Sequence, residues 1–124
     1  MTAEELVARA ETAAPRAYAP YSRYFVGASV LAKDGRMFDG VNVENAAYPL
    51  GVCAERTAIS AAAGEGLRPG DLEAIGITAS PCGGCRQWLY EWRFERVYFR
   101  RDDGSIADYT PAALLPDTWD LPEA

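Results

Sequence analysis

Histidine is absent from this sequence, and cysteine occurs only three times among the 124 residues. Without histidine, the chain can offer at most three nitrogen or sulfur ligands to one metal ion, so a closed site of four such ligands is excluded. An odd number of cysteines also excludes a complete set of disulfides within one chain. In a reducing compartment, clustered cysteines are more typical of metal binding or catalysis.

Positive charge is scarce as well: 12 lysines and arginines face 18 acidic residues, which gives a formal net charge of -6. Non-specific binding to nucleic acid or to an anionic membrane needs a basic surface, so this balance disfavours both partners. No apolar run is long enough for a membrane-spanning helix, and the opening M-T-A-E-E-L-V does not resemble a signal peptide. We therefore expect a cytoplasmic protein that binds neither nucleic acid nor membrane.

The length and composition predict one globular domain over residues 1–124. Hydrophobic residues make up 49% and charged residues 24%, an ordinary mixture for a folded domain. Helices are predicted at residues 2–14, 53–63, 83–92 and just after Thr110, and strands at 26–32, 37–43, 72–79 and 96–99. The segments K-D-G-R and Asp103-Gly104 predict hairpin turns. This order predicts the α/β class, with one sheet and helices on both of its faces.

The three cysteines lie in two short motifs, C-A-E-R from Cys53 and P-C-G-G-C-R with Cys82 and Cys85. Each motif opens a predicted helix, and the N-terminus of a helix favours thiolate over thiol. Three protein ligands and an open fourth position are typical of a catalytic zinc site. Glu55, two residues after Cys53, is a candidate general acid and base beside that open position.

Three thiolates around Zn²⁺ leave a formal charge of -1, which a nearby cation would offset. Arg56 and Arg86 each follow a cysteine motif closely enough to donate to the sulfurs, and spacing alone does not say which of them does so. A redox pair, a structural zinc site or simple core cysteines are the alternatives. The complete C-A-E and P-C-x-x-C pattern favours a zinc deaminase site over these alternatives.

Six motifs in order extend this pattern over nearly the whole chain. They are Y-A-P-Y-S from residue 18, V-G-A from 26, N-V-E-N-A-A-Y from 42, C-A-E-R-T-A from 53, P-C-G-G-C-R-Q from 81 and L-L-P from 114. With them the sequence resembles the cytidine deaminase family, in its small homotetrameric branch with three cysteines at zinc. The resemblance implies a three-layer α/β/α fold with one mixed sheet, and hydrolysis of cytidine and deoxycytidine to uridine, deoxyuridine and ammonia in pyrimidine salvage. It also implies a Zn²⁺ cofactor, a nucleoside substrate and a homotetramer with shared active sites.

The resemblance also implies roles for individual residues. The three cysteines would hold zinc, and Glu55 would carry protons from the attacking water to the pyrimidine N3 and then to the leaving ammonia. Asn42 and Glu44 would hold the ribose 3′-hydroxyl. Backbone groups near Ala54 and Ser80 would contact the base. Taken alone, alternate polar residues on a strand could equally be solvated, so the assignment of the sugar contacts depends on the resemblance.

Two aromatic positions depart from the family pattern. Tyr24 stands where the family usually has a phenylalanine that lines the base pocket, and its hydroxyl needs a partner or water. Trp119 stands where a phenylalanine usually reaches into the site of a neighbouring subunit, although packing or an interface contact is the alternative for this ring. Tyr48 is more typical of core or interface packing than of ligand contact. These changes concern substrate preference more than reaction type.

Three other functions are alternatives to cytidine deamination. Deamination of a modified cytosine nucleoside such as blasticidin S shares the cysteine motifs, but N-A-A-Y matches nucleoside salvage better. Editing of a polynucleotide is disfavoured by the small size and the negative charge. A non-catalytic zinc-binding scaffold is disfavoured by Glu55, because a structural metal site has no need of that carboxylate.

Overall fold

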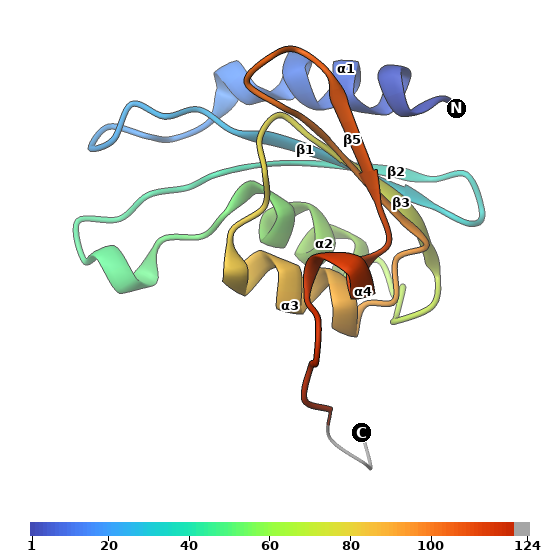
Figure 1. Ribbon diagram of the computed structural model, residues 1–124. Coiled ribbons are helices and arrows are strands. Elements are labelled where there is room, and N and C mark those ends of the chain that lie inside the picture. Colours follow the sequence, from blue (N-terminus) through green and yellow to red (C-terminus); the bar gives the residue numbers. More distant parts are fainter. Residues whose placement is uncertain (121–124) are drawn as a thin grey trace.

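Five strands form one mixed sheet in the computed structural model, which describes residues 1–120 (Figure 1). The strands are β1 (Gly27–Ala32), β2 (Met37–Val41), β3 (Leu72–Ile77), β4 (Arg96–Arg100) and β5 (Ile106–Tyr109). Their order in the sheet is β2-β1-β3-β4-β5, with β3 and β4 parallel and every other neighbouring pair antiparallel. The last four residues of the predicted domain, 121–124, lie outside the described residues.

Helices cover both faces of this sheet (Figure 1). Helix α1 (Ala3–Ala13) packs on one face against β1 and β3, and α2 (Ala54–Gly64) packs on the other against β2 and β1. Helices α3 (Gly83–Glu91) and α4 (Pro111–Leu114) lie on the same face as α2. The predicted α/β class with a three-layer α/β/α arrangement is confirmed. No helix within residues 1–120 has the length and apolar composition that a membrane crossing requires.

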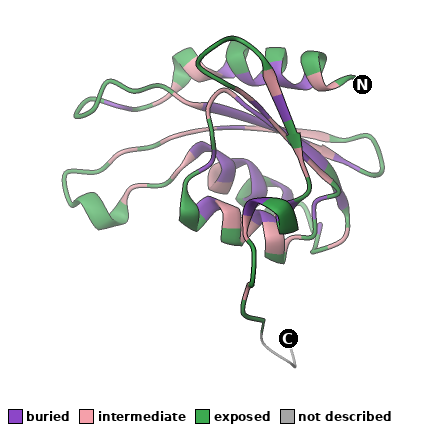
Figure 2. Cartoon of the chain, in the orientation of Figure 1, coloured by how far each residue is buried: buried purple, intermediate pink, exposed green. Residues whose placement is uncertain are grey.

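The first helix shows why the local predictions succeed. Thr2 caps α1 by accepting a hydrogen bond from the backbone of Glu5 at 3.1 Å. Its inward face, Leu6, Val7, Ala10 and Ala13, is buried against the sheet, whereas its outer face is exposed (Figure 2). Capping and a 3.6-residue apolar period act within a few residues of each other. The helix therefore begins and ends within one residue of the predicted bounds.

Two glycines let the helices approach the sheet backbone to backbone. A Cβ atom on Gly40 of β2 would overlap the backbone of Ala54 and Ala58 in α2, and one on Gly76 of β3 would overlap Leu6 in α1. Only glycine permits such an approach. The N-terminal turn of α2, which carries Glu55, is therefore seated directly on the sheet.

Candidate functional site

The three cysteine sulfurs meet where two helices begin. Cys53 is the N-cap of α2 and Cys82 is the N-cap of α3, while Cys85 lies in the first turn of α3. All three sulfurs lie within 4.8 Å of one another, and the sulfurs of Cys53 and Cys82 are 3.9 Å apart. A tetrahedral zinc ion with Zn–S bonds of about 2.3 Å separates its sulfur ligands by roughly 3.8 Å. The residues present therefore fit a zinc ion.

The cluster is arranged to hold negative charge. Hydrogen bonding with the Cys85 thiol lowers the pKa of Cys53 to about 6, and the positive charge of Arg56 acts in the same direction. The same hydrogen bond raises the pKa of Cys85, which is fully buried. The backbone N–H of Cys85 also donates to the Cys82 sulfur at 3.4 Å. A coordinated metal ion would override these differences, because it deprotonates its thiol ligands outright.

Arg56 is the arginine that lies against the sulfurs. Its Nη2 is 3.8 Å from the Cys82 sulfur, and its Nε is buried with no hydrogen-bond partner among residues 1–120. Space for this guanidinium exists because residue 84 is glycine: a Cβ there would overlap Arg56 Nη2. A cation at this position offsets part of the charge that three thiolates bring.

Arg86 points elsewhere. Its Nε donates to the Pro81 carbonyl at 3.0 Å, its Nη1 to the Leu114 carbonyl at 3.2 Å and its Nη2 to the Ser80 hydroxyl at 3.1 Å. The sequence left open which arginine would face the thiolates, and the structure directs these three Arg86 donors to oxygen atoms instead.

Glu55 lies in the first turn of α2, next to the cluster, and is only 4% exposed. Burial raises the pKa of this carboxyl group, and the negative charge of Cys53 contributes to the increase. A raised pKa suits a carboxyl group that must both take up and release a proton.

A cavity of about 210 Å³ opens beside Glu55 and brings most of the predicted substrate residues together. Its lining consists of Ser22, Tyr24, Val26, Asn42, Glu44, Cys53, Ala54, Glu55, Ala79, Ser80 and Cys82. Every residue that the sequence proposed for substrate binding is in this set except Trp119. Cys85 is buried and lies outside the lining, whereas Cys82 is exposed.

Asn42 and Glu44 bind the tyrosine-rich loop before β1, which forms part of the cavity wall. The Asn42 amide accepts from Val26 N and donates to Tyr24 O, both at 2.8 Å. The Glu44 carboxylate accepts from the backbone of Tyr21 at 2.9 Å and from the backbone and hydroxyl of Ser22. These bonds hold the tyrosine-rich loop before β1 over the cavity. Hydrogen bonding from Ser22 lowers the pKa of Glu44.

Ser22 is a site residue for which the sequence predicted no role. It lines the cavity and contacts Glu44 across 22 positions of sequence. The available signal was Y-A-P-Y-S, an irregular segment with a serine before a strand, but a loop serine is usually solvated. The isolated bridges from Val43 to Tyr18 and Val52, with the bonds made by Asn42 and Glu44, bring this loop, the polar strand end and the Cys53 segment together.

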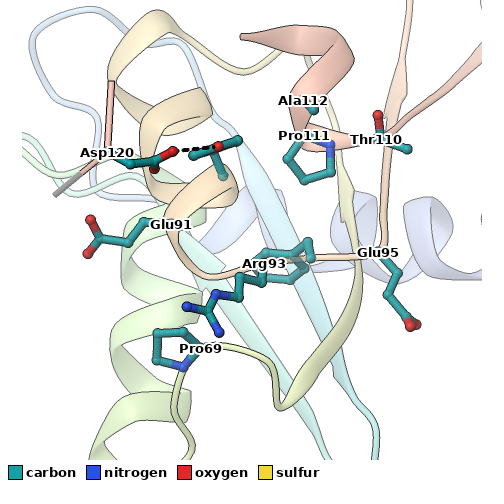
Figure 3. Close-up of a pocket in the computed structure, with 10 residues that line it drawn as sticks. Pro69, Glu91, Arg93, Glu95, Thr110, Pro111, Ala112 and Asp120 are labelled. Carbon is teal, nitrogen blue, oxygen red and sulfur yellow. Dashed lines mark hydrogen bonds between the residues drawn. The ribbon is translucent and has the colours of Figure 1, made fainter. Parts of the chain in front are cut away.

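Trp119 is not brought to the cavity of its own chain. Its side chain is 73% exposed on the segment after α4. A separate hollow of about 660 Å³ lies near this segment, lined by residues of α3, α4 and the loop at Pro69 (Figure 3). None of the three cysteines lines it, and Asp120 at its edge accepts a hydrogen bond from Tyr90 at 2.9 Å.

Known proteins are similar to this chain in sequence and in fold. The sequence model for the cytidine and deoxycytidylate deaminase zinc-binding region matches residues 1–101. Cytidine deaminases from Sporosarcina psychrophila and Halalkalibacterium halodurans are 41% and 43% identical over 94% of this chain, which covers 90% and 92% of those proteins. The crystal structure of cytidine deaminase from Burkholderia pseudomallei is similar with a TM-score of 0.89 and 40% identity, covering 96% of this chain and 100% of that one. Because the matched region contains all three cysteines and the similarity spans nearly the whole chain, the protein belongs to the cytidine and deoxycytidylate deaminase family.

Proposed function

We propose that this protein is a zinc-dependent cytidine deaminase, which hydrolyses cytidine and deoxycytidine to uridine and deoxyuridine with release of ammonia. The observation that carries the proposal is the convergence of two cysteine sulfurs, buried Glu55 and the polar pair Asn42 and Glu44 on one cavity. The family match to a zinc-binding region and the three-cysteine cluster make zinc the cofactor. We infer that one deaminase domain spans residues 1–124.

The reaction replaces the amino group on C4 of the base by oxygen from water. When bound by the three cysteines, zinc lowers the pKa of the attacking water. Glu55 takes the proton released by that water, delivers it to N3 and so makes C4 a better electrophile. A second proton passes through Glu55 to the amino nitrogen, which leaves as ammonia while the C4 carbonyl forms. Because Glu55 is buried, its proton is exchanged with substrate rather than with bulk solvent.

Asn42 and Glu44 retain hydrogen-bonding capacity for a sugar. A primary amide carries two donors and two acceptor sites, and Asn42 uses one of each on the loop. A carboxylate offers about four acceptor sites, and Glu44 uses three of them. The remaining donor of Asn42 and the remaining acceptor of Glu44 can therefore bind one ribose hydroxyl group, which both accepts and donates. Tyr24, on the same cavity wall, supplies an aromatic surface for the base.

We infer that the protein acts as a homotetramer in the cytoplasm. Large apolar and aromatic side chains are exposed in two neighbouring segments, which run on the outside of the fold (Figure 2). These side chains are Tyr18, Tyr21, Tyr24, Phe25, Val43, Tyr48, Leu50 and Val52. An apolar surface of this kind favours association with another protein surface. A reducing compartment is required to keep three unpaired cysteines available for zinc.

Replacing Trp119 by alanine should raise the KM for cytidine by about fivefold with little change in kcat, because loss of an aromatic contact to the base weakens binding. In this proposal the exposed ring enters the site of a neighbouring subunit. Steady-state kinetics measures the effect, and sedimentation of the same sample confirms that the tetramer persists. Trp119→Phe, which retains a ring, is the matched control. An unchanged KM in the alanine variant would assign this side chain to packing.

An ammonia-release screen tests the proposed function. Cytidine, deoxycytidine, free cytosine and blasticidin S are offered to the protein, and zinc is measured on the same sample. We expect about one zinc ion per chain and ammonia from the two nucleosides. Ammonia from blasticidin S alone would favour the modified-nucleoside alternative. Bound zinc without ammonia from any of the four compounds would favour the non-catalytic scaffold.

A further inference from the structure

We propose that Arg86 is a positioning residue for the deamination site, in that its guanidinium fixes Ser80 and Pro81, which connect the wall of the substrate cavity to Cys82. The inference rests on the proposed function. It adds a residue that affects the substrate indirectly, through Ser80 and Pro81. Arg86 itself does not line the cavity.

The segment between the end of β3 at Ile77 and the start of α3 at Gly83 belongs to no strand or helix. It nevertheless carries two residues of the cavity wall, Ala79 and Ser80, and ends at Cys82. An irregular segment lacks the repeated backbone bonds of a helix or sheet, so side chains must define its position. Cys82 is held separately, as the N-cap of α3 with the backbone N–H of Cys85 donating to its sulfur at 3.4 Å, so a displacement of Ser80 and Pro81 would move the cavity wall and leave that sulfur in place.

Arg86 holds this segment in place with three N–H donors of its planar guanidinium group. Nε donates to Pro81 O at 3.0 Å and Nη2 to Ser80 Oγ at 3.1 Å, so two adjacent residues of the segment are held at once. Nη1 donates to Leu114 O at 3.2 Å, a carbonyl at the end of α4 that its own helix leaves without a partner. The fork therefore ties the segment to both α3 and α4. A lysine ammonium, as a single point of attachment, cannot reproduce this geometry.

The bond to Ser80 has a further consequence for the cavity. Because Arg86 donates to Ser80 Oγ, one lone pair of that oxygen is occupied while the hydroxyl hydrogen stays free. Ser80 is thus held as a hydrogen-bond donor at the cavity wall. A substrate that presents an acceptor, such as the pyrimidine O2, would benefit from this orientation.

A double-mutant cycle tests the proposal, with Arg86→Gln, Ser80→Ala and their combination. We expect Arg86→Gln to raise the KM for cytidine roughly tenfold, more than it lowers kcat, with zinc retention against a chelator unchanged. Ser80→Ala should have a smaller effect, and that effect should disappear in the Arg86→Gln background because the contact is already lost. Arg96→Gln is the matched control, since Arg96 pairs with Asp108 on the surface formed by β4 and β5.

The rival interpretations give different results. If Arg86 balanced thiolate charge, Arg86→Gln would weaken zinc retention, as we expect of Arg56→Gln because Arg56 lies against the Cys82 sulfur, and that result would overturn the proposal. Additive effects of the two substitutions, or an unchanged KM, would also overturn it. If Arg86→Gln does not fold, the double-mutant cycle is measured with Arg86→Lys in its place, and the same outcomes support or overturn the proposal. A wild-type protein that releases no ammonia from cytidine would contradict the proposed function itself, and binding of uridine, measured by calorimetry on the same variants, would then test the role of Arg86 separately.

Discussion

Replacing Glu55 by glutamine should lower kcat for cytidine by about a thousandfold while one zinc ion per chain stays bound. A positioned general acid and base typically accelerates a reaction by about this factor. Glutamine has nearly the same shape as glutamate, so the buried site next to the cysteines can remain packed. It cannot take up a proton from the attacking water or return one to N3. Ammonia release and zinc content measured on the same sample check both halves of the expectation.

The matched control is Glu65→Gln at the other end of the same helix. Glu65 is exposed at the C-cap of α2, and the same chemical change there should leave kcat within about twofold of wild type, as is usual for surface substitutions. If Glu55→Gln retained full activity, the proton route proposed for this carboxylate would be wrong. If Glu55→Gln lost zinc, the residue would support the metal site rather than the chemistry.

Replacing Cys85 by alanine should reduce bound zinc from about one ion per chain to less than about a tenth, and ammonia release should fall in proportion. Cys85 is fully buried, so no water reaches its position easily, and the chain has no fourth cysteine and no histidine to replace it. A site left with two thiolates loses a large part of its affinity, because three protein ligands are the usual minimum for a catalytic zinc ion. Metal analysis after dialysis against a weak chelator measures the effect.

A buried control separates loss of the ligand from loss of packing. Ser29 is equally buried on β1 and donates to Asp39 at 2.6 Å, on the face of the sheet covered by α1. Ser29→Ala should lower stability without removing zinc. Full zinc content in Cys85→Ala would rule out the three-cysteine site and return this residue to the core.

The elements that carry the site could be predicted because their signals are local. Cys53 and Cys82 each open a predicted helix, so both sulfurs were expected at helix N-termini, where the structure has them as N-caps. Glu55 then falls in the first turn of α2 by spacing alone. The hairpin between β1 and β2 follows from K-D-G-R in the same way. Each of these features depends on residues fewer than about ten positions apart.

Other features of the site depend on contacts between distant segments. The loop serine, Ser22, meets Glu44 from 22 positions away, and a serine in a loop is by itself no different from a solvated one. The two arginines after the cysteine motifs were equivalent candidates by spacing. The fold separates them, because Gly84 makes room for Arg56 beside the sulfurs while Leu114 and Ser80 supply oxygen acceptors for Arg86.

The sequence by itself therefore determined the chemistry that this protein can perform: three thiolates, no histidine and one carboxylate at a helix start leave a zinc ion with an open position and an acid–base partner. The tertiary structure alone decided which arginine lies against the thiolates, Arg56, and which donates its hydrogen bonds to oxygen atoms, Arg86. The reason is physical. Capping and helix periodicity act over a few residues, whereas the direction of a long side chain such as arginine is set by the acceptors and the space that distant segments bring next to it.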